Sequence, residues 1–329
     1  MSDEEVRSRK FHSRSYALDT IMGVNLAGMT FVITGTTSGI GIETARSLAL
    51  HGAHVVMLNR NIEESEKLKK KIVDEMYDAE IDIIHCDLNS LRSVKKAAEE
   101  YIAKRWPIHC LILNAGVFGT VSPTTTDGLE SHFGINHLAH FLLLRELLPV
   151  VRQSAPSRII LVSSSVHAQC GVVPSMELDE KVKFLCPESP SDATWFRLYA
   201  RSKMCNMLIA FKLHRDEYAN EISTYSVHPG NGVRTSILRD SWFGNIASFL
   251  STPFTKNISQ GAATSVYCAG NPEVAKVSGK YWESCWDDEK NLYEEVARDE
   301  QLQDALWKKS EEVVERLIGR VQDSCLFEC

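Results

Sequence analysis

Short apolar runs rich in β-branched residues alternate along the chain with longer segments of helical period, from residue 30 onward. This alternation is typical of a parallel sheet that is covered by helices on both faces. It predicts an α/β fold, a three-layer Rossmann-type doubly wound parallel sheet. We expect its strands at Met29–Thr34, His54–Asn59, Ile81–Cys86, Cys110–Asn114, Arg158–Val162, Ser223–Val227 and Gly279–Trp282.

Helical periodicity is clearest over Ser90–Lys104, where Asn89 or Ser90 is placed to cap the start. Glu43–His51 is also predicted to be helical, and Leu292–Ile318 is predicted to be an acidic amphipathic helical end. No internal repeat or Pro/Ser-rich linker divides the chain. We therefore expect one domain over residues 25–318, an extension over residues 1–24 that drapes over the domain or frays, and a tail over residues 319–329.

Composition narrows the class of protein only a little. The 329 residues are 44% hydrophobic and 24% charged, which excludes collagen, low-complexity disorder and a small disulfide scaffold. The net charge of −7 argues against a nucleic-acid partner but leaves room for a local basic pocket. The nine cysteines are irregularly spaced and include no CxxC pair, so we expect reduced thiols and no metal site.

Targeting signals are not evident in the sequence. The longest apolar runs fall far short of the roughly 18 residues that a spanning helix needs. Residues 1–5 are acidic and polar, which fits neither a signal peptide nor a transit peptide. We expect a cytoplasmic protein without a transmembrane segment.

Three glycines follow the first predicted strand, at Gly35, Gly39 and Gly41. Between a buried strand and a helix, glycines allow a tight turn and close approach of the backbone to a pyrophosphate, although glycine also serves as ordinary turn punctuation. The second strand ends at Arg60, where NAD-binding folds carry an acid. An arginine suits a 2′-phosphate, which favours NADP(H) over NAD(H); the alternative is an exposed arginine without a role.

Tyr199 and Lys203 are four residues apart in a segment of helical character and so share a helix face. A nearby ammonium should lower the pKa of a phenol, which would make Tyr199 a general acid/base. Alone, this spacing more often marks a surface pair. What changes the interpretation is the order of motifs along the chain: the glycine-rich turn, Asn114-Ala115-Gly116, Asn136, Ser163-Ser164-Ser165 and then the Tyr/Lys pair.

In this order of motifs the chain resembles the short-chain dehydrogenase/reductase family over roughly residues 25–290. The resemblance implies catalytic roles for Asn136, Ser164, Tyr199 and Lys203, with Tyr199 exchanging the proton, Ser164 orienting the oxygen and Lys203 holding the nicotinamide ribose. It implies hydride transfer between a nicotinamide and a carbinol carbon, and homodimers or homotetramers. The cofactor residues predicted from motifs and resemblance together are Gly35, Thr37, Ser38, Gly39, Ile40, Gly41, Arg60, Asp87, Leu88, Asn114, Ala115, Gly116, Tyr199, Lys203, Pro229 and Gly230.

The substrate is expected to be a small hydrophobic carbonyl or alcohol, such as a steroid, retinoid or lipid aldehyde, because residues 230–255 carry many large apolar side chains. Those side chains could equally complete the core or an oligomer interface. Thr235 falls one residue beyond the family's usual spacing. His132, His137 and His140 are interpreted as structural or surface histidines, and Trp195 as packing. The alternative function is a low-turnover scaffold that uses the acidic C-terminal helix or a flap as a partner surface.

Overall fold

The computed structural model describes residues 10–119, 122–190, 193–230 and 256–319. It contains a seven-stranded sheet in the order β3-β2-β1-β4-β5-β6-β7, with every neighbouring pair parallel. This confirms the predicted fold, and each predicted strand is confirmed to within one residue at either end. The strands are β1 (Thr30–Thr34), β2 (His54–Asn59), β3 (Ile81–His85), β4 (Cys110–Leu113), β5 (Ser157–Val162), β6 (Ile222–His228) and β7 (Lys280–Glu283).

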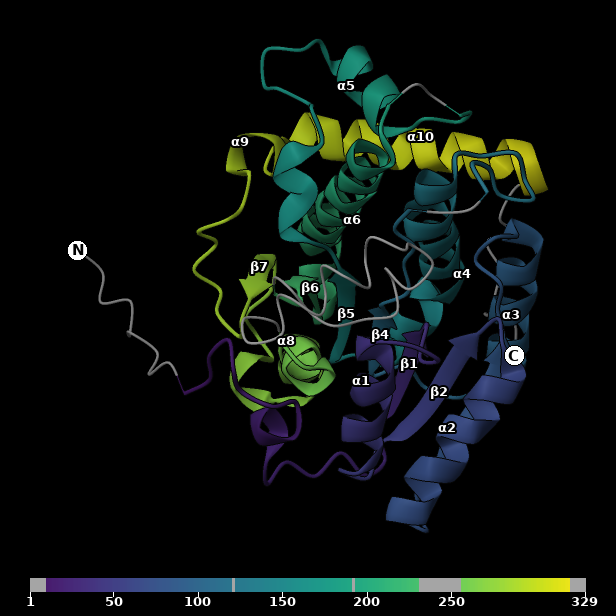
Figure 1. Cartoon of the computed structure of the whole chain (residues 1–329), viewed down its shortest axis with the longest axis vertical. Helices are drawn as coiled ribbons and strands as arrows, with labels where there is room; N and C mark the ends of the chain where they lie inside the picture. The colour runs from purple at the N-terminus through teal and green to yellow at the C-terminus, as the bar shows by residue number, and fades with distance from the viewer. Residues whose placement is uncertain (1–9, 120–121, 191–192, 231–255, 320–329) are drawn as a thin grey trace, which may run out of the picture.

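Helices cover both faces of the sheet (Figure 1). One face packs against α1 (Ile40–Ala49), α2 (Ile62–Glu75) and α8 (Ile258–Gly270), and the other against α3 (Leu91–Lys104), α4 (Ala139–Gln153) and α6 (Trp195–Glu217). Side chains alternate along β1: Phe31 and Ile33 belong to the first core, and Val32 belongs to the second. All five residues of β1 are buried, as expected for a central parallel strand.

Residues 10–24 pack onto the domain. Phe11, Ala17 and Ile21 are buried against the side of the sheet that α1 and α8 cover, and Ile21 ends a short turn of helix, η1 (Leu18–Ile21). The Trp286 indole donates a hydrogen bond to the Phe11 carbonyl at 2.6 Å. Of the two behaviours predicted for this extension, draping over the domain is the one seen for residues 10–24.

Two helix boundaries differ from the prediction. The first helix begins at Ile40, earlier than the predicted Glu43, because Gly39 ends the turn in a conformation that leads directly into α1. The predicted helix Leu292–Ile318 is two helices, α9 (Glu294–Ala297) and α10 (Glu300–Ile318). The Asp299 side chain accepts a hydrogen bond from the Leu302 amide and so begins a new helix at Glu300. For α3, Ser90 is the residue that caps the start.

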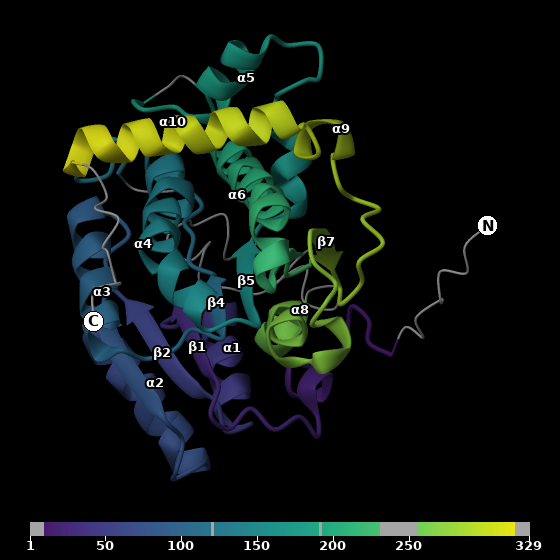
Figure 2. The same ribbon diagram turned by 180° about the vertical axis from the view of Figure 1, so that it is seen from behind.

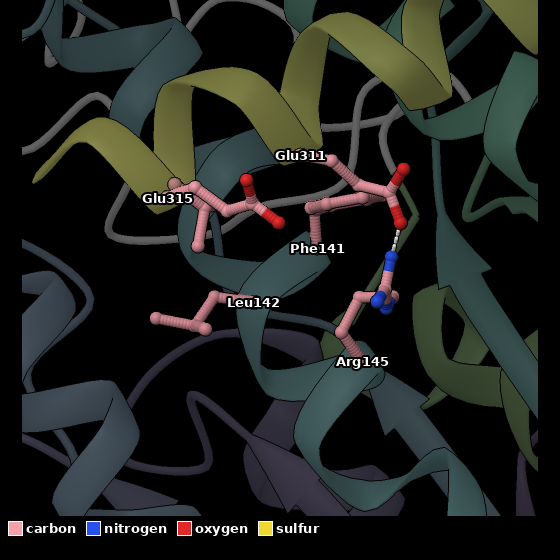
Figure 3. Close-up of a pocket in the computed structure, with 6 residues that line it drawn as sticks. Phe141, Leu142, Arg145, Glu311 and Glu315 are labelled. Carbon is pink, nitrogen blue, oxygen red and sulfur yellow. Dashed lines mark ion pairs between the residues drawn. The ribbon is translucent and has the colours of Figure 1, made fainter. Parts of the chain in front are cut away.

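Helix α10 crosses α6 and α4 on the side of these helices that faces away from the sheet, as Figure 2 shows. Its acidic residues form ion pairs within the chain: Glu311 with Arg145, and Asp304 with Lys212 and Arg215. The cavity between α10 and α4, shown in Figure 3, holds only about 10 Å³ and is lined by Phe141, Leu142, Arg145, Glu311, Val314 and Glu315. These ion pairs help hold α10 on the domain, and the partner role of its acidic surface stays a prediction.

Helix α5 (Leu178–Leu185) belongs to the connection from β5 to α6 and packs against α10, above which it lies in Figure 1. Seven cysteines lie in the described ranges, and all are free and buried, in agreement with the predicted thiols. Within these ranges no helix is long and apolar enough to cross a membrane. Nor do three or more His, Cys, Asp or Glu side chains gather there as a metal site would require.

Candidate active site

The glycine-rich turn lies at the carboxyl edge of the sheet, at the point between β1 and β4 where the strand order reverses. A Cβ atom on Gly41 would lie 2.1 Å from the Gly35 carbonyl oxygen, and one on Gly35 would lie 2.7 Å from the Ala115 Cβ. Gly35 also has a φ of +73°. Only glycine allows the two turns to meet this closely, and ligands of doubly wound sheets bind at this switch point.

Two buried side chains hold the glycine-rich turn in place. The Thr34 hydroxyl accepts hydrogen bonds from the amides of Asn114 and Ala115, at 3.0 and 3.1 Å. The Asn59 amide group accepts from the Thr36 backbone N–H at 2.8 Å and donates to the Thr36 hydroxyl at 2.6 Å. Sequence reasoning missed Asn59, although an uncharged amide at the end of the second strand, next to Arg60, was a readable signal.

The remaining predicted cofactor residues lie along the same edge. Thr37 is half-buried and Ser38 is exposed in the turn, while Ile40 is the first residue of α1. The Asp87 carboxylate accepts a hydrogen bond from the Asn89 backbone N–H at 3.0 Å, and Leu88 packs against the core. Arg60 is exposed, and no carboxylate among the described residues pairs with it. Neither it nor Asp87 is hydrogen-bonded to the glycine turn.

The Asn114 side chain has a hydrogen-bond acceptor without a partner among the described residues. Its side-chain NH₂ group donates to the carbonyls of Thr34 and Gly35, at 2.8 and 3.1 Å. Its Oδ1 atom is buried, with no hydrogen-bond partner in the described structure. Because a buried acceptor without a partner is costly, this atom is suited to accept a hydrogen bond from a bound ligand.

Ser164, Tyr199 and Lys203 come together where β5 ends beside α6. The side chains of Ser164 and Tyr199 are hydrogen-bonded, whereas the Ser163 hydroxyl donates to the Lys203 carbonyl at 2.9 Å. The Lys203 Nζ atom donates to the Val162 carbonyl at 2.9 Å and lies 5.5 Å from the centre of the Tyr199 ring. The structure thus brings the predicted serine, tyrosine and lysine into one cluster.

The predicted lowering of the Tyr199 pKa is wrong for this structure. Burial raises the pKa of Tyr199 to about 12, and the Ser164 hydrogen bond opposes this only in part. Burial also lowers the pKa of Lys203 to about 8. The surrounding protein disfavours the charged form of both groups by more than the ammonium favours the phenolate, so Tyr199 keeps its proton at neutral pH.

Asn136 lies on a π-helical turn, Phe133–Leu138, that leads into α4. Its side chain clamps the backbone of Val117, accepting from the N–H at 2.7 Å and donating to the carbonyl at 3.0 Å. It also donates to the Ser202 hydroxyl at 3.0 Å. A Cβ atom on Gly116 would lie 3.3 Å from the Lys203 Nζ and 3.4 Å from the Asn136 Oδ1, so these three residues meet.

The three neighbouring histidines all bind protein groups. His132 pairs with Glu130, and His137 with Ser310 of α10 at 2.9 Å. His140 donates to the Asn136 carbonyl at 3.0 Å, so its other ring nitrogen accepts from the Thr34 hydroxyl at 2.9 Å. His140 therefore connects the turn after β1 with the turn that carries Asn136, a positioning role that the predicted structural assignment did not specify.

Acidification is expected to destabilise the protein through His140. Burial lowers the pKa of His140 from 6.5 to about 4, so between these pH values the unfolded chain binds a proton that the folded chain does not. Stability is complete above pH 6.5 and falls by about 3 kcal/mol by pH 4 from this residue alone. Urea unfolding at the two pH values measures the loss, which should shrink in His140→Asn and persist in the exposed control His85→Asn. Equal losses in all three proteins would contradict this.

The turn after β6 contains Pro229 and Gly230, with a φ of +97° at Gly230. Lys256 donates to the Pro229 carbonyl at 3.2 Å and to the Ser284 hydroxyl at 3.3 Å, and burial lowers its pKa. Sequence reasoning missed this lysine, which adds a cation at the carboxyl end of β6. Thr235 and the predicted apolar flap, apart from Gly230, lie outside the described residues.

The chain belongs to the short-chain dehydrogenase/reductase family, whose members are nicotinamide-dependent oxidoreductases. Residues 29–175 match the family model for short chain dehydrogenases. Several sequence segments predict a resemblance to WW domain-containing oxidoreductases and, less closely, to retinol dehydrogenases, and sequence identity over most of the chain confirms it. These segments include Leu50–Val55, Asn136–Leu138, Arg201–Asn206, Val227–Asn231 and Pro253–Lys256.

A WW domain-containing oxidoreductase from Gallus gallus is 38% identical over 313 residues, covering 95% of this chain and 74% of the relative. Retinol dehydrogenase 12 from Mus musculus is 34% identical over 291 residues, covering 88% of each chain. Among solved structures, an uncharacterised protein from Mycobacterium paratuberculosis has a TM-score of 0.65 at 25% identity, covering 90% of this chain and 97% of that one. L-Sorbose reductase from Gluconobacter frateurii, complexed with NADPH and L-sorbose, shares the fold with a TM-score of 0.60, covering 79% and 96% of the two chains at 18% identity.

Proposed function

We propose that this protein is an NADP(H)-dependent oxidoreductase that acts on the carbonyl or alcohol group of a hydrophobic substrate. The observation that carries the proposal is the cluster of Ser164, Tyr199 and Lys203 beside Asn136, at the same sheet edge as the glycine-rich turn. In this arrangement a proton donor lies beside a dinucleotide-type turn, which is what reduction of a carbonyl requires.

The residues at the sheet edge fit a nicotinamide dinucleotide. Gly35 and Gly41 keep the turn free of side chains, the first amides of α1 face the edge, and Asn114 offers a buried acceptor without a partner. Lys203 and Asn136 meet at Gly116, where they would hold the nicotinamide end. When bound, such a cofactor supplies or accepts the hydride.

The chain's own side chains supply the proton chemistry. Tyr199 carries its proton at neutral pH and can donate it to a carbonyl oxygen. The Ser164 hydroxyl, hydrogen-bonded to the phenol, would bind the same oxygen and orient it. The buried ammonium of Lys203 would stabilise the phenolate that forms, because opposite charges interact strongly away from water.

A substrate panel tests the proposal. With NADPH, we expect turnover of apolar ketones and aldehydes and much weaker turnover of small polar carbonyls, followed as consumption of NADPH. Turnover restricted to small polar carbonyls would contradict the hydrophobic substrate, and no NADPH-dependent turnover of any carbonyl would contradict the function. A cytoplasmic location, homodimers or homotetramers and the lack of a nucleic-acid partner stay predictions from the sequence.

Arg60 is proposed to bind the 2′-phosphate of NADP(H). It is exposed at the end of β2 and no carboxylate in the described structure competes for it, so its guanidinium can form a charge-assisted bidentate contact. Arg60→Gln should raise the Kd for NADPH by about 10- to 100-fold and leave the Kd for NADH unchanged. Fluorescence titration measures both constants. Arg105→Gln is the control, because Arg105 is an exposed arginine at the C-terminal end of α3, away from the carboxyl edge of the sheet. Equal affinity of the parent protein for NADH and NADPH would contradict this assignment.

A further inference from the structure

The Tyr199 ring is bordered by aromatic side chains from two elements. The Phe118 ring, from the turn after β4, lies 4.7 Å from the Tyr199 ring centre and 4.5 Å from the Trp195 ring centre. Both contacts are edge-to-face, at interplanar angles of 81° and 89°. Trp195 and Tyr199 are one turn apart on α6, so Phe118 contacts one face of that helix at two successive turns.

This aromatic surface extends from the Tyr199 ring to solvent. Trp195 is 50% exposed and its neighbour Phe196 is 38% exposed, while Phe118 and Tyr199 are half-buried. The prediction that Trp195 only packs is therefore incomplete, since half of its surface is available. Exposed apolar side chains that adjoin a site, unlike scattered ones, mark a binding surface.

A buried carboxylate–imidazole pair fixes the backbone next to Phe118. The Gly119 amide donates to the His132 Nε2 at 3.3 Å, and the His132 Nδ1 donates to the Glu130 carboxylate at 2.7 Å. Glu130 is 3% exposed and His132 is 2% exposed. The residue on the other side, Val117, is held by Asn136. Both neighbours of Phe118 are thus fixed by buried side chains, which gives the ring a defined position before any ligand binds.

We propose that Phe118 and Trp195 form the specificity-determining wall of the site, and that Glu130 and His132 are its positioning residues. The wall selects a substrate whose carbonyl or alcohol is attached to a flat, unsaturated or aromatic hydrocarbon, because planar groups form edge-to-face and offset-stacked contacts with such rings. The inference rests on the proposed function, to which it adds the shape of the substrate and the residues that recognise it.

Binding of 2-naphthaldehyde to the full chain, measured by calorimetry in the presence of NADP⁺, tests the wall without requiring turnover. The parent should bind 2-naphthaldehyde about tenfold or more tightly than the non-planar cyclohexanecarbaldehyde. Phe118→Ala and Trp195→Ala should each raise the Kd for 2-naphthaldehyde by about tenfold, whereas Trp195→Phe should restore most of the affinity. Tyr77→Ala removes an aromatic ring that is 89% exposed near the end of α2 and should change nothing.

The wall would be refuted by equal affinity for the two aldehydes, by absent binding of 2-naphthaldehyde, or by unchanged affinity in both alanine variants. Naphthaldehyde binding that follows these expectations, in a protein without NADPH-dependent turnover, would support the wall and contradict the proposed function. Loss of turnover in Tyr199→Phe with no effect of the wall variants would do the reverse.

The positioning role of His132 has its own readout. His132→Asn keeps a donor for Glu130 but is too short to accept from Gly119, whereas His132→Gln is long enough to do so. We expect faster hydrogen exchange at the Gly119 amide and a higher Kd for 2-naphthaldehyde in His132→Asn, with both effects smaller in His132→Gln. A folded His132→Asn protein with unchanged exchange at Gly119 would refute the role.

Discussion

Replacing Tyr199 with phenylalanine should lower kcat by about 10²- to 10⁴-fold, which is the usual contribution of a positioned general acid. The substitution removes only the hydroxyl, so the ring keeps its edge-to-face contact with Phe118 and its place beside Lys203. Because the lost atom is the proton donor, the effect should fall on the chemical step. The Kd for NADPH should change little.

Single-turnover and steady-state kinetics with an apolar ketone, together with fluorescence titration of NADPH, measure these effects. The matched control is Tyr218→Phe, which removes a hydroxyl from a tyrosine just beyond the C-terminal end of α6 that is 46% exposed. Its kcat should equal that of the parent. If Tyr199→Phe retained the parental kcat, the proton would come from another group and the assignment of Tyr199 would fail.

The pKa of Tyr199 illustrates what spacing along a chain cannot predict. The separation of Tyr199 and Lys203 correctly indicates that they share a helix face. It contains no information on burial, and burial is what decides the direction of both pKa shifts. The aromatic wall could not be predicted for a similar reason. Phe118 and Trp195 are far apart in the sequence, and only the topology of the sheet brings their rings together.

Strands β1, β4 and β5 could be predicted because each is a short, fully or largely buried apolar run between turn residues, and burial on both faces leaves little freedom in where it ends. The break between α9 and α10 was missed because the apolar period continues across it, while the capping role of Asp299 depends on the geometry of a single hydrogen bond. Glu130 is different, since its position two residues before His132 was a local signal that could have been noticed.

Gly41→Ala should disable the cofactor turn. The added Cβ would lie 2.1 Å from the Gly35 carbonyl oxygen and 2.7 Å from the Asn114 Nδ2, and neither the backbone nor this hydrogen-bonded amide can yield easily. The turn must therefore move away from the edge of β4. We expect the Kd for NADPH to rise by about 100-fold, since misplacing a site by about 1 Å has effects of this size. Overpacking of this kind should also lower the free energy of unfolding by about 1–3 kcal/mol.

Gly28→Ala is the matched control, because it makes the same chemical change at the opposite end of β1. Gly28 has a φ of +79° and nothing within 4 Å of the added Cβ. The substitution should therefore cost only backbone strain, about 1 kcal/mol in urea unfolding, and leave the Kd for NADPH unchanged. Gly41→Ala could instead behave like this control, with a lower free energy of unfolding but the parental affinity for NADPH. Close contact between the two turns would then serve only the fold. The dinucleotide would in that case have to bind away from the switch point between β1 and β4.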